Sequence, residues 1–418
     1  MPTMYRHWSF GKKFAREEML YRKGAQSLAY ELVINSNPCV NYIMEENTAT
    51  MQTLVIAHAA FGHNHFFKNN QLFRQWTRAD RVLDELAYAK KFLADCEQRY
   101  GLDAVEDLLD SAHALMQQSV DRYAPKRQST SDKKQKAESR AQYLESTYND
   151  LYRTLPTTAD RAAKPLTETE EEAKQERSAL ELPQENLLGF LARHAPKLKD
   201  WQREVLEIVR RLAQYFYPQR QTKLMNEGCA TFTHYEIMNR LHDRGQVDQG
   251  AMLEFLHMHT AVVTQPSFDS KFYQGINPYA LGFAMMRDIQ RICEHPEEED
   301  RSWFPEIAGN GEAMQTIRHA WAEYRDESFV MQFLSPRLIR ELRMFAVNNH
   351  SDQPFVSINE IHDEQGYRNI RQQLASQYDL SKQDADIEVT DADLKGSRRL
   401  VLTHRVHNGR RLNKEQCN

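Results

Sequence analysis

Three histidines lie within eight residues of one apolar stretch, residues 47–70, whose sequence is NTATMQTLVIAHAAFGHNHFFKNN. They are His58, His63 and His65, and imidazole is the commonest side-chain ligand for transition metals in proteins. The apolar residues around them recur with the spacing of one helical face, which indicates a buried helix. A polar group on such a face needs a partner, a water molecule or a metal ion. The stretch is therefore the first candidate for a functional site.

Helical geometry decides which of these histidines can share an ion. Zinc sites on helices use ligands one turn apart. His58 and His63 are five residues apart, which on an ideal α-helix means about 140° of rotation and about 7.5 Å of rise. His58 and His65 lie about 10.5 Å apart along the axis, which is too far for a shared ion. His58 and His63 can meet only if the helix breaks or forms a π-bulge near Gly62.

A second segment, MNEGCATFTHY at residues 225–235, supplies a carboxylate and a further histidine. We predict that His58, His63, Glu227 and His234 meet across a helix–helix contact, and their side-chain types suit a divalent, zinc-like transition metal. Two alternatives stay open: a buried hydrogen-bonded network without metal, and an interface patch. Because neutral imidazole is the form that binds, metal affinity should fall below about pH 6.5. The motif HExxH is absent from the sequence, which argues against an ordinary metallopeptidase.

Weaker candidates surround these two segments. Glu254, His257 and His259 form the string E-x-x-H-x-H, but di-iron carboxylate proteins use two such ExxH pairs, and here there is one. Glu45 and Glu46 precede the first histidine helix and are better explained as a charged helix start than as ligands. Phosphate-binding glycine loops and the GxSxG serine motif are absent from the sequence, which disfavours nucleotide hydrolysis and common serine hydrolases.

Composition narrows the class of protein. The chain has 418 residues, with 41% hydrophobic residues, 27% charged residues and a net charge of −5. It is long enough for two or more domains, and its charge gives no sign of a nucleic-acid partner. We expect no membrane span, because no apolar run approaches about 18 residues, and no signal peptide. Five scattered cysteines without CxxC spacing indicate reduced thiols in a cytoplasmic protein.

The elements that must position the candidate residues are mostly helices. We predict a mainly α fold: a multi-helix body, a short strand near the N-terminus at residues 30–35, and a small α+β appendage at the C-terminus. One continuous helix is expected over 76–100, and another over 201–216 that stops before Pro218. Asn69 and Asn70 should end the first histidine helix, with an asparagine in the left-handed conformation.

The composition divides the chain into four parts. These are an N-terminal helical part with the histidine-rich helix, a charged linker or exposed helix, a second helical part that carries MNEGCATFTHY, and a small α+β domain, over residues 1–124, 125–183, 184–343 and 344–418.

Five long blocks resemble the SpoVR family, which is named for stage V of bacterial sporulation. They are HWSFGKKF, YELVINSNPCVNYIMEENT, AHAAFGHNHFFKNN, YFYPQRQTKLMNEGCATFTHY and INPYALGFAMMRDI, at residues 7–14, 30–48, 57–70, 215–235 and 276–289. The resemblance covers nearly the whole chain. The family pattern EGWATFWHY is altered here, with Cys229 and Thr233 in place of two tryptophans. Against the family's usual length, the chain is expected to be shortened at both ends.

The resemblance implies a role but no reaction. It implies a factor in sporulation, specifically spore cortex formation, or in bacterial stress adaptation, with an AAA-type serine kinase and a von Willebrand-type protein as partners. Our first hypothesis is a cytoplasmic factor that acts through such partners around a buried His/Glu cluster. The alternative is a metal-dependent, hydrolase-like enzyme that uses His58, His63, Glu227 and His234.

Overall fold

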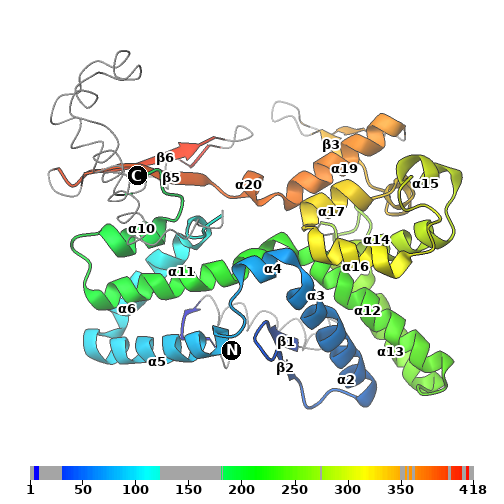
Figure 1. The fold of residues 1–418 in the computed structure, drawn as a ribbon, viewed down its shortest axis with the longest axis horizontal. Coiled ribbons are helices and arrows are strands. Elements are labelled where there is room, and N and C mark those ends of the chain that lie inside the picture. Colours follow the sequence, from blue (N-terminus) through cyan, green and yellow to red (C-terminus); the bar gives the residue numbers. More distant parts are fainter. Residues whose placement is uncertain are drawn as a thin grey trace, which may run out of the picture.

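The computed structural model describes residues 4–8, 31–122, 180, 182–273, 275–348, 354, 357–359, 363–393, 397–406 and 411–413. Within them the fold is mainly α, as the sequence predicts (Figure 1). Most of the expected charged linker, over residues 125–183, lies outside the described residues. The predicted four-part division of the chain stays a prediction.

The helices fall into two groups along the chain. Before residue 123 they are α2 (Ala49–Ile56), the π-helix η1 (Ala57–His63), α3 (Asn64–Asn69), α4 (Gln71–Trp76), α5 (Val82–Tyr100), α6 (Leu102–Ala114) and the 3₁₀ turn η2 (Met116–Gln118). After residue 183 they are α10 (Leu187–His194), α11 (Asp200–Gln221), α12 (Lys223–Asp243), α13 (Gln249–Val263), α14 (Pro278–Glu294), α15 (Glu298–Trp303), α16 (Ala313–Glu323), α17 (Asp326–Phe333), α18 (Pro336–Glu341), α19 (Glu364–Tyr378) and α20 (Leu380–Gln383).

Three antiparallel pairs make up the sheets of the described residues. The strands are β1 (Glu31–Ile34) with β2 (Val40–Ile43), β3 (Ala346–Asn348) with β4 (Ser357–Asn359), and β5 (Asp386–Ala392) with β6 (Leu400–Arg405). The short N-terminal strand is confirmed, but it is one half of a hairpin whose second strand the sequence reading missed. The C-terminal strands match the predicted α+β character of that end.

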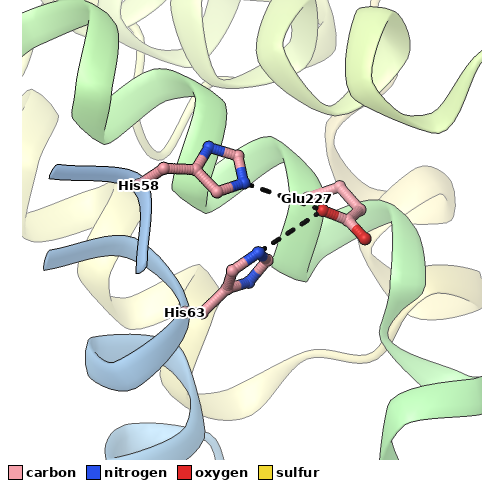
Figure 2. A group of neighbouring side chains, drawn as sticks. All are labelled: His58, His63 and Glu227. Atoms are coloured by element: carbon pink, nitrogen blue, oxygen red, sulfur yellow. Dashed lines mark ion pairs between the residues drawn. The ribbon is translucent and has the colours of Figure 1, made fainter. Parts of the chain in front are cut away.

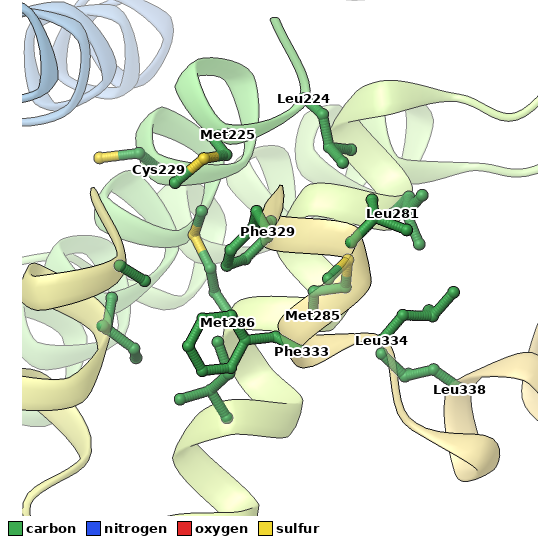
Figure 3. Close-up of a cluster of buried hydrophobic side chains, with 14 of the residues drawn as sticks. Leu224, Met225, Cys229, Leu281, Met285, Met286, Phe329, Phe333, Leu334 and Leu338 are labelled. Carbon is green, nitrogen blue, oxygen red and sulfur yellow. The ribbon is translucent and has the colours of Figure 1, made fainter. Parts of the chain in front are cut away.

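Helix α12 packs closely against two other elements, helix α14 and the π-helix η1. It can lie close to α14 because both helices carry glycine at their crossing. A Cβ on Gly228 would lie 2.7 Å from the Cα of Gly282, inside any real contact distance. Leu224, Met225 and Cys229 then pack into the main core beside Met285 and Met286, with the other members of the cluster around them (Figure 3). The backbone of α12 is therefore fixed over the turns that carry the candidate residues.

A second core joins α5, α6 and α11 and does not reach the candidate site. Val205 and Val209 of α11 are completely buried there. On its outer face Arg210 and Arg211 pair with Glu207 and Glu204, at 2.8 Å and 2.6 Å. These carboxylates are thus part of a solvated helix face and not of a site.

Three local expectations are wrong. The helix predicted over 76–100 begins only at Val82, as α5. Trp76 is the last residue of the preceding helix α4, which ends there because Thr77 is extended. Helix α11 continues through Pro218 to Gln221, since a proline in the last turn costs one hydrogen bond while its ring is buried. Asn70 is extended, at φ −67° and ψ 132°, because it caps the next helix by accepting from the Leu72 amide.

In the part of the chain that the structure describes, no helix is both long enough and apolar enough to cross a membrane.

Candidate metal centre

The histidine-rich stretch is an α-helix that widens into a π-helix where its first two histidines lie. Thr48 caps α2 by accepting from the Met51 amide at 3.1 Å, and the chain then continues into η1, which begins one residue before His58 and ends at His63. A π-helix joins residue i to residue i+5, so residues five apart lie about one turn from each other. The imidazole centroids of His58 and His63 are 4.7 Å apart. The π-helix thus removes the misalignment that an α-helix would impose.

Gly62 allows this wide turn to rest directly on α12. A Cβ at this position would lie 2.4 Å from the Cα of Ala230 and 2.7 Å from its Cβ. Real side chains do not approach a backbone so closely, so only glycine fits between the two elements. The close contact places the histidines of η1 against the first turns of α12, where Glu227 lies.

His58, His63 and Glu227 converge on one point (Figure 2). Glu227 Oε2 is 3.6 Å from His63 Nε2 and 4.0 Å from His58 Nε2. One ligand atom from each residue lies within 4.8 Å of the other two. Tetrahedral zinc needs ligand atoms about 3.4 Å apart, so small side-chain rotations would bring the three to coordination distance. Both histidines are buried, and the Glu227 side chain is 17% exposed, while its Oε2 atom, which faces the histidines, is buried.

The far nitrogen of each ligand histidine is held by its own partner. His63 Nδ1 lies 2.9 Å from Asn226 Oδ1, and His58 Nδ1 lies 2.9 Å from His234 Nδ1. An amide oxygen only accepts, so His63 donates from Nδ1 and its Nε2 carries the lone pair that faces Glu227. Outer partners of this kind orient ligand histidines in metal sites. His234, predicted as a fourth ligand, lies behind His58 and outside the group of three.

The structure adds His259, whose role the sequence reading missed. His259 Nδ1 lies 2.9 Å from His234 Nε2, and both residues are buried. Its position on the apolar stripe of α13, with Met252 and Phe255, was the signal that could have revealed it. The residues of the E-x-x-H-x-H string do not converge, because His257 is exposed and Glu254 accepts a hydrogen bond from Thr48, the N-cap of α2.

The remaining candidates lie outside the centre. His65 contacts Asn69 and the ring of Trp321, and Glu45 and Glu46 are exposed ahead of α2. Within the described residues, the group formed by the two η1 histidines and the α12 carboxylate is the one set of three or more His, Cys, Asp or Glu side chains with such spacing.

Burial favours the neutral form of His58 and of the two histidines behind it, His234 and His259. Desolvation lowers the pKa of His58 and of His234 well below the usual range, and neighbouring histidines lower both further. Desolvation also lowers the pKa of His259 to about 4. Neutral imidazole is the form that donates a lone pair to a metal. The protein therefore supplies binding-competent histidines at neutral pH.

A buried carboxyl group positions the turn that carries Glu227. Asp326 accepts from the amides of Leu224 and Met225 at 2.8 Å and 2.9 Å, at the start of α12. Its burial raises its pKa to about 8, although these two bonds favour the charged form. Asp326 thereby satisfies backbone donors that a helix start leaves unpaired, and it fixes the orientation of Asn226 and Glu227.

Comparison with known proteins agrees with the blocks quoted above. The family described as "SpoVR like protein" matches residues 1–383, and its "SpoVR-like C-terminal domain" matches residues 385–418. The chain belongs to the SpoVR family. This SpoVR chain is 53% identical over 409 residues to "Uncharacterized protein YcgB" of Escherichia coli (strain K12), which covers 98% of this chain and 78% of that protein. No solved structure matches.

The departure from the family pattern at Cys229 falls in the core and not in the centre. The thiol is completely buried, and its Sγ lies 3.9 Å from the Gly62 carbonyl oxygen. Burial raises its pKa far above the usual range, so the thiol stays protonated. Cys229 is therefore a packing residue of this SpoVR chain rather than a soft metal ligand.

Proposed function

We propose that this SpoVR protein binds one divalent transition metal ion, zinc-like in its ligand preference, through His58, His63 and Glu227. The observation that carries the proposal is the π-helix, which brings two histidines five residues apart to within 4.0 Å of one carboxylate oxygen. π-helical turns are rare in proteins, and they frequently lie at functional sites.

The ligand set indicates a reactive rather than a purely structural centre. Two histidines and one carboxylate are the protein ligands of catalytic zinc sites, which keep a fourth position for water or substrate and activate what binds there. We therefore propose a hydrolase-like, metal-dependent reaction, in which His234 orients His58 through the hydrogen bond between their Nδ1 atoms.

Metal content of the full chain tests this proposal. Protein purified without chelators should contain close to one transition metal ion per chain, and Glu227→Gln should lower the affinity at least about 100-fold, because it removes an anionic ligand. His65→Ala is the matched control, since His65 lies on the next turn but outside the centre. A metal-free wild-type protein that also fails to take up Zn²⁺, Co²⁺ or Fe²⁺ would contradict the proposal.

A second proposal follows from the family role: a cytoplasmic factor in sporulation or stress adaptation that acts through protein partners. The observation that favours it is Phe61, whose side chain is 60% exposed on the π-helix between the two ligand histidines. Aromatic residues are enriched in the contact surfaces between proteins, and Phe61 lies beside the proposed site. The partners that the resemblance implies are an AAA-type serine kinase and a von Willebrand-type protein.

Binding of the purified kinase and the von Willebrand-type protein from the same organism tests the second proposal. Phe61→Ser should weaken the complex at least about tenfold if the ring is an anchor, while Tyr100→Ser, a comparably exposed aromatic on α5, should leave it unchanged. Equal affinity of wild type and Phe61→Ser, or no complex at all, would contradict it.

A further inference from the structure

Thr231, in the middle of α12, carries a buried hydroxyl that the candidate ligands do not use. The residue is completely buried, and among the residues that the structure describes its Oγ1 atom has no hydrogen-bond partner. A threonine in a helix commonly bonds to the carbonyl oxygen one turn earlier. Thr53, Thr222 and Thr264 of this protein all do so, at 2.8 Å, 2.7 Å and 2.7 Å. Thr231 departs from this local rule, at a cost in stability that a valine, with the same branched shape, would avoid.

Helical geometry places Thr231 on the turn of α12 that lies alongside the His58 ring. That ring faces two residues of α12: its Nε2 is 4.0 Å from Glu227 Oε2, and its Nδ1 is 2.9 Å from His234 Nδ1. Those two residues are seven apart, about 10.5 Å along the helix, so the ring spans the turn between them. Thr231 is on that turn, about 40° around the helix from Glu227 and about 60° from His234. It therefore shares the face of α12 that carries the candidate carboxylate ligand.

An uncommitted hydroxyl on this face suits a small ligand that enters the centre. A threonine hydroxyl can donate one hydrogen bond and accept others, and Thr231 has no described protein partner that fixes its role. It can therefore accept from a protonated oxygen and donate to an anionic one. The centre offers three protein ligands, and metal sites of that kind keep a further position for water or substrate.

We propose that Thr231 is a ligand-binding residue of the candidate centre, and that its hydroxyl hydrogen-bonds a small oxygen-donor ligand, such as a carboxylate or a hydroxamate, beside Glu227. The inference rests on the proposed metal site, because the ion is what attracts such a ligand. The hydroxyl itself does not hold the ion. Its removal should therefore weaken the binding of the small ligand while leaving the affinity for metal unchanged, which no residue that supports His58, His63 or Glu227 would do.

The stability of the metal-free full chain is the first test. Thr231→Val removes a hydroxyl without a protein partner, so urea titration should give an unfolding equilibrium constant that is unchanged or smaller. Thr222→Val is the matched control, because Thr222 is equally buried and its bond to the Pro218 carbonyl is lost, which should raise the constant about fivefold. A Thr231→Val protein that is destabilised as much as Thr222→Val, or that does not fold, would overturn the proposal, since its hydroxyl would then have a partner within the protein.

The second test uses Co²⁺, whose visible absorption reports on its ligands, and acetohydroxamate as the oxygen-donor probe. Thr231→Val should bind Co²⁺ as tightly as wild type but acetohydroxamate about tenfold more weakly, which corresponds to one hydrogen bond. Thr231→Ser keeps the hydroxyl and should bind the probe as wild type does. Thr233→Val, about 120° from Glu227 around the same helix, should leave the probe affinity unchanged.

The outcomes separate this inference from the metal site itself. If wild type binds Co²⁺ but no acetohydroxamate, or if Thr231→Val binds the probe with unchanged affinity, the inference is wrong and the metal site stands. If Thr231→Val loses affinity for Co²⁺ as Glu227→Gln does, Thr231 supports the metal ligands and the inference is likewise wrong. A wild-type chain that takes up no Co²⁺ contradicts the proposed function and this inference together.

Discussion

Two histidine clusters in this protein are built from similar parts but differ in what their nitrogens face. In the N-terminal cluster (Tyr5, His7, Asp110 and His113), the imidazoles of His7 and His113 stack 4.1 Å apart at 9°. Tyr5 Oη lies 2.7 Å from His113 Nε2, and His7 Nε2 lies 2.9 Å from Asp110 Oδ1. Here the bonded nitrogens point to separate partners, and the cluster fastens residues 4–8 to α6.

In the candidate metal centre the two imidazoles stand edge to face instead, at 81°, and both Nε2 atoms face the same carboxylate oxygen. Their Nδ1 atoms are held from behind by Asn226 and His234. The difference shows that buried histidines with hydrogen-bond partners are not in themselves a site. What distinguishes the centre is the convergence of two Nε2 atoms on one carboxylate oxygen, and that convergence depends on the π-helix.

The largest effect on this contrast should come from Gly62→Ala. The new methyl group would meet the Cα of Ala230 at 2.4 Å and push η1 away from α12. We expect an unfolding free energy lower by about 1–3 kcal/mol, and a loss of metal affinity greater than that of any outer-partner variant. Urea titration and Zn²⁺ titration measure the two effects. Gly250→Ala in the first turn of α13, with its nearest contact at 3.3 Å, is the control. An unchanged Zn²⁺ affinity would show that the π-helix does not set the centre.

Asn226→Leu should come next, and it should act on the metal rather than on the fold. It removes the acceptor that holds His63 Nδ1–H, so Zn²⁺ affinity should fall about 10–100-fold. The unfolding free energy of the metal-free protein should fall by only about 1 kcal/mol, the contribution of one hydrogen bond. A matched loss of stability without loss of affinity would make the two clusters alike, against the contrast drawn here.

Acid should destabilise the metal-free protein through both clusters. Burial lowers the pKa of His113 and of His259 to about 4 each. The unfolded chain takes up these protons near pH 6.5 but the folded chain does not, so stability is lost as pH falls from about 6.5 to about 4. After allowance for solvent screening, His113 should contribute on the order of 1–2 kcal/mol.

Urea titrations at pH 7.0, 5.5 and 4.5 measure this dependence. His113→Gln and His259→Gln should each flatten the dependence of the unfolding free energy on pH, because glutamine does not titrate in this range. If neither variant changes the slope, the two histidines are not the groups responsible.

The smallest effect should be that of Tyr5→Phe, which sharpens the contrast from the other side. The change deletes the hydroxyl that bonds to His113 and should lower the unfolding free energy by about 1 kcal/mol. Zn²⁺ affinity should stay at the wild-type value. A weakened affinity would link the two clusters, which share no contact among the residues that the structure describes.

Much of the fold was predictable because it depends on local patterns. The apolar spacing of residues 47–70 and 201–216 specified buried helices, which the structure confirms. The failures came where tertiary contacts override a local rule. Pro218 stays inside α11 because it is buried. Asn70 is extended because its side-chain oxygen caps α4 and its side-chain NH₂ group donates to the carbonyl oxygens of Trp321 and Tyr324.

For the centre itself, the sequence determined the residue types and the condition for their use: His58 and His63 can act together only if the helix changes its pitch near Gly62. Only the tertiary structure decided that it does, since the π-helix is held by the close contact of Gly62 with Ala230 on α12. The same contact selects Glu227 as the third member. The hydrogen bonds that join His58, His234 and His259 could not be predicted for the same reason, because contacts between three different helices leave no spacing in the sequence.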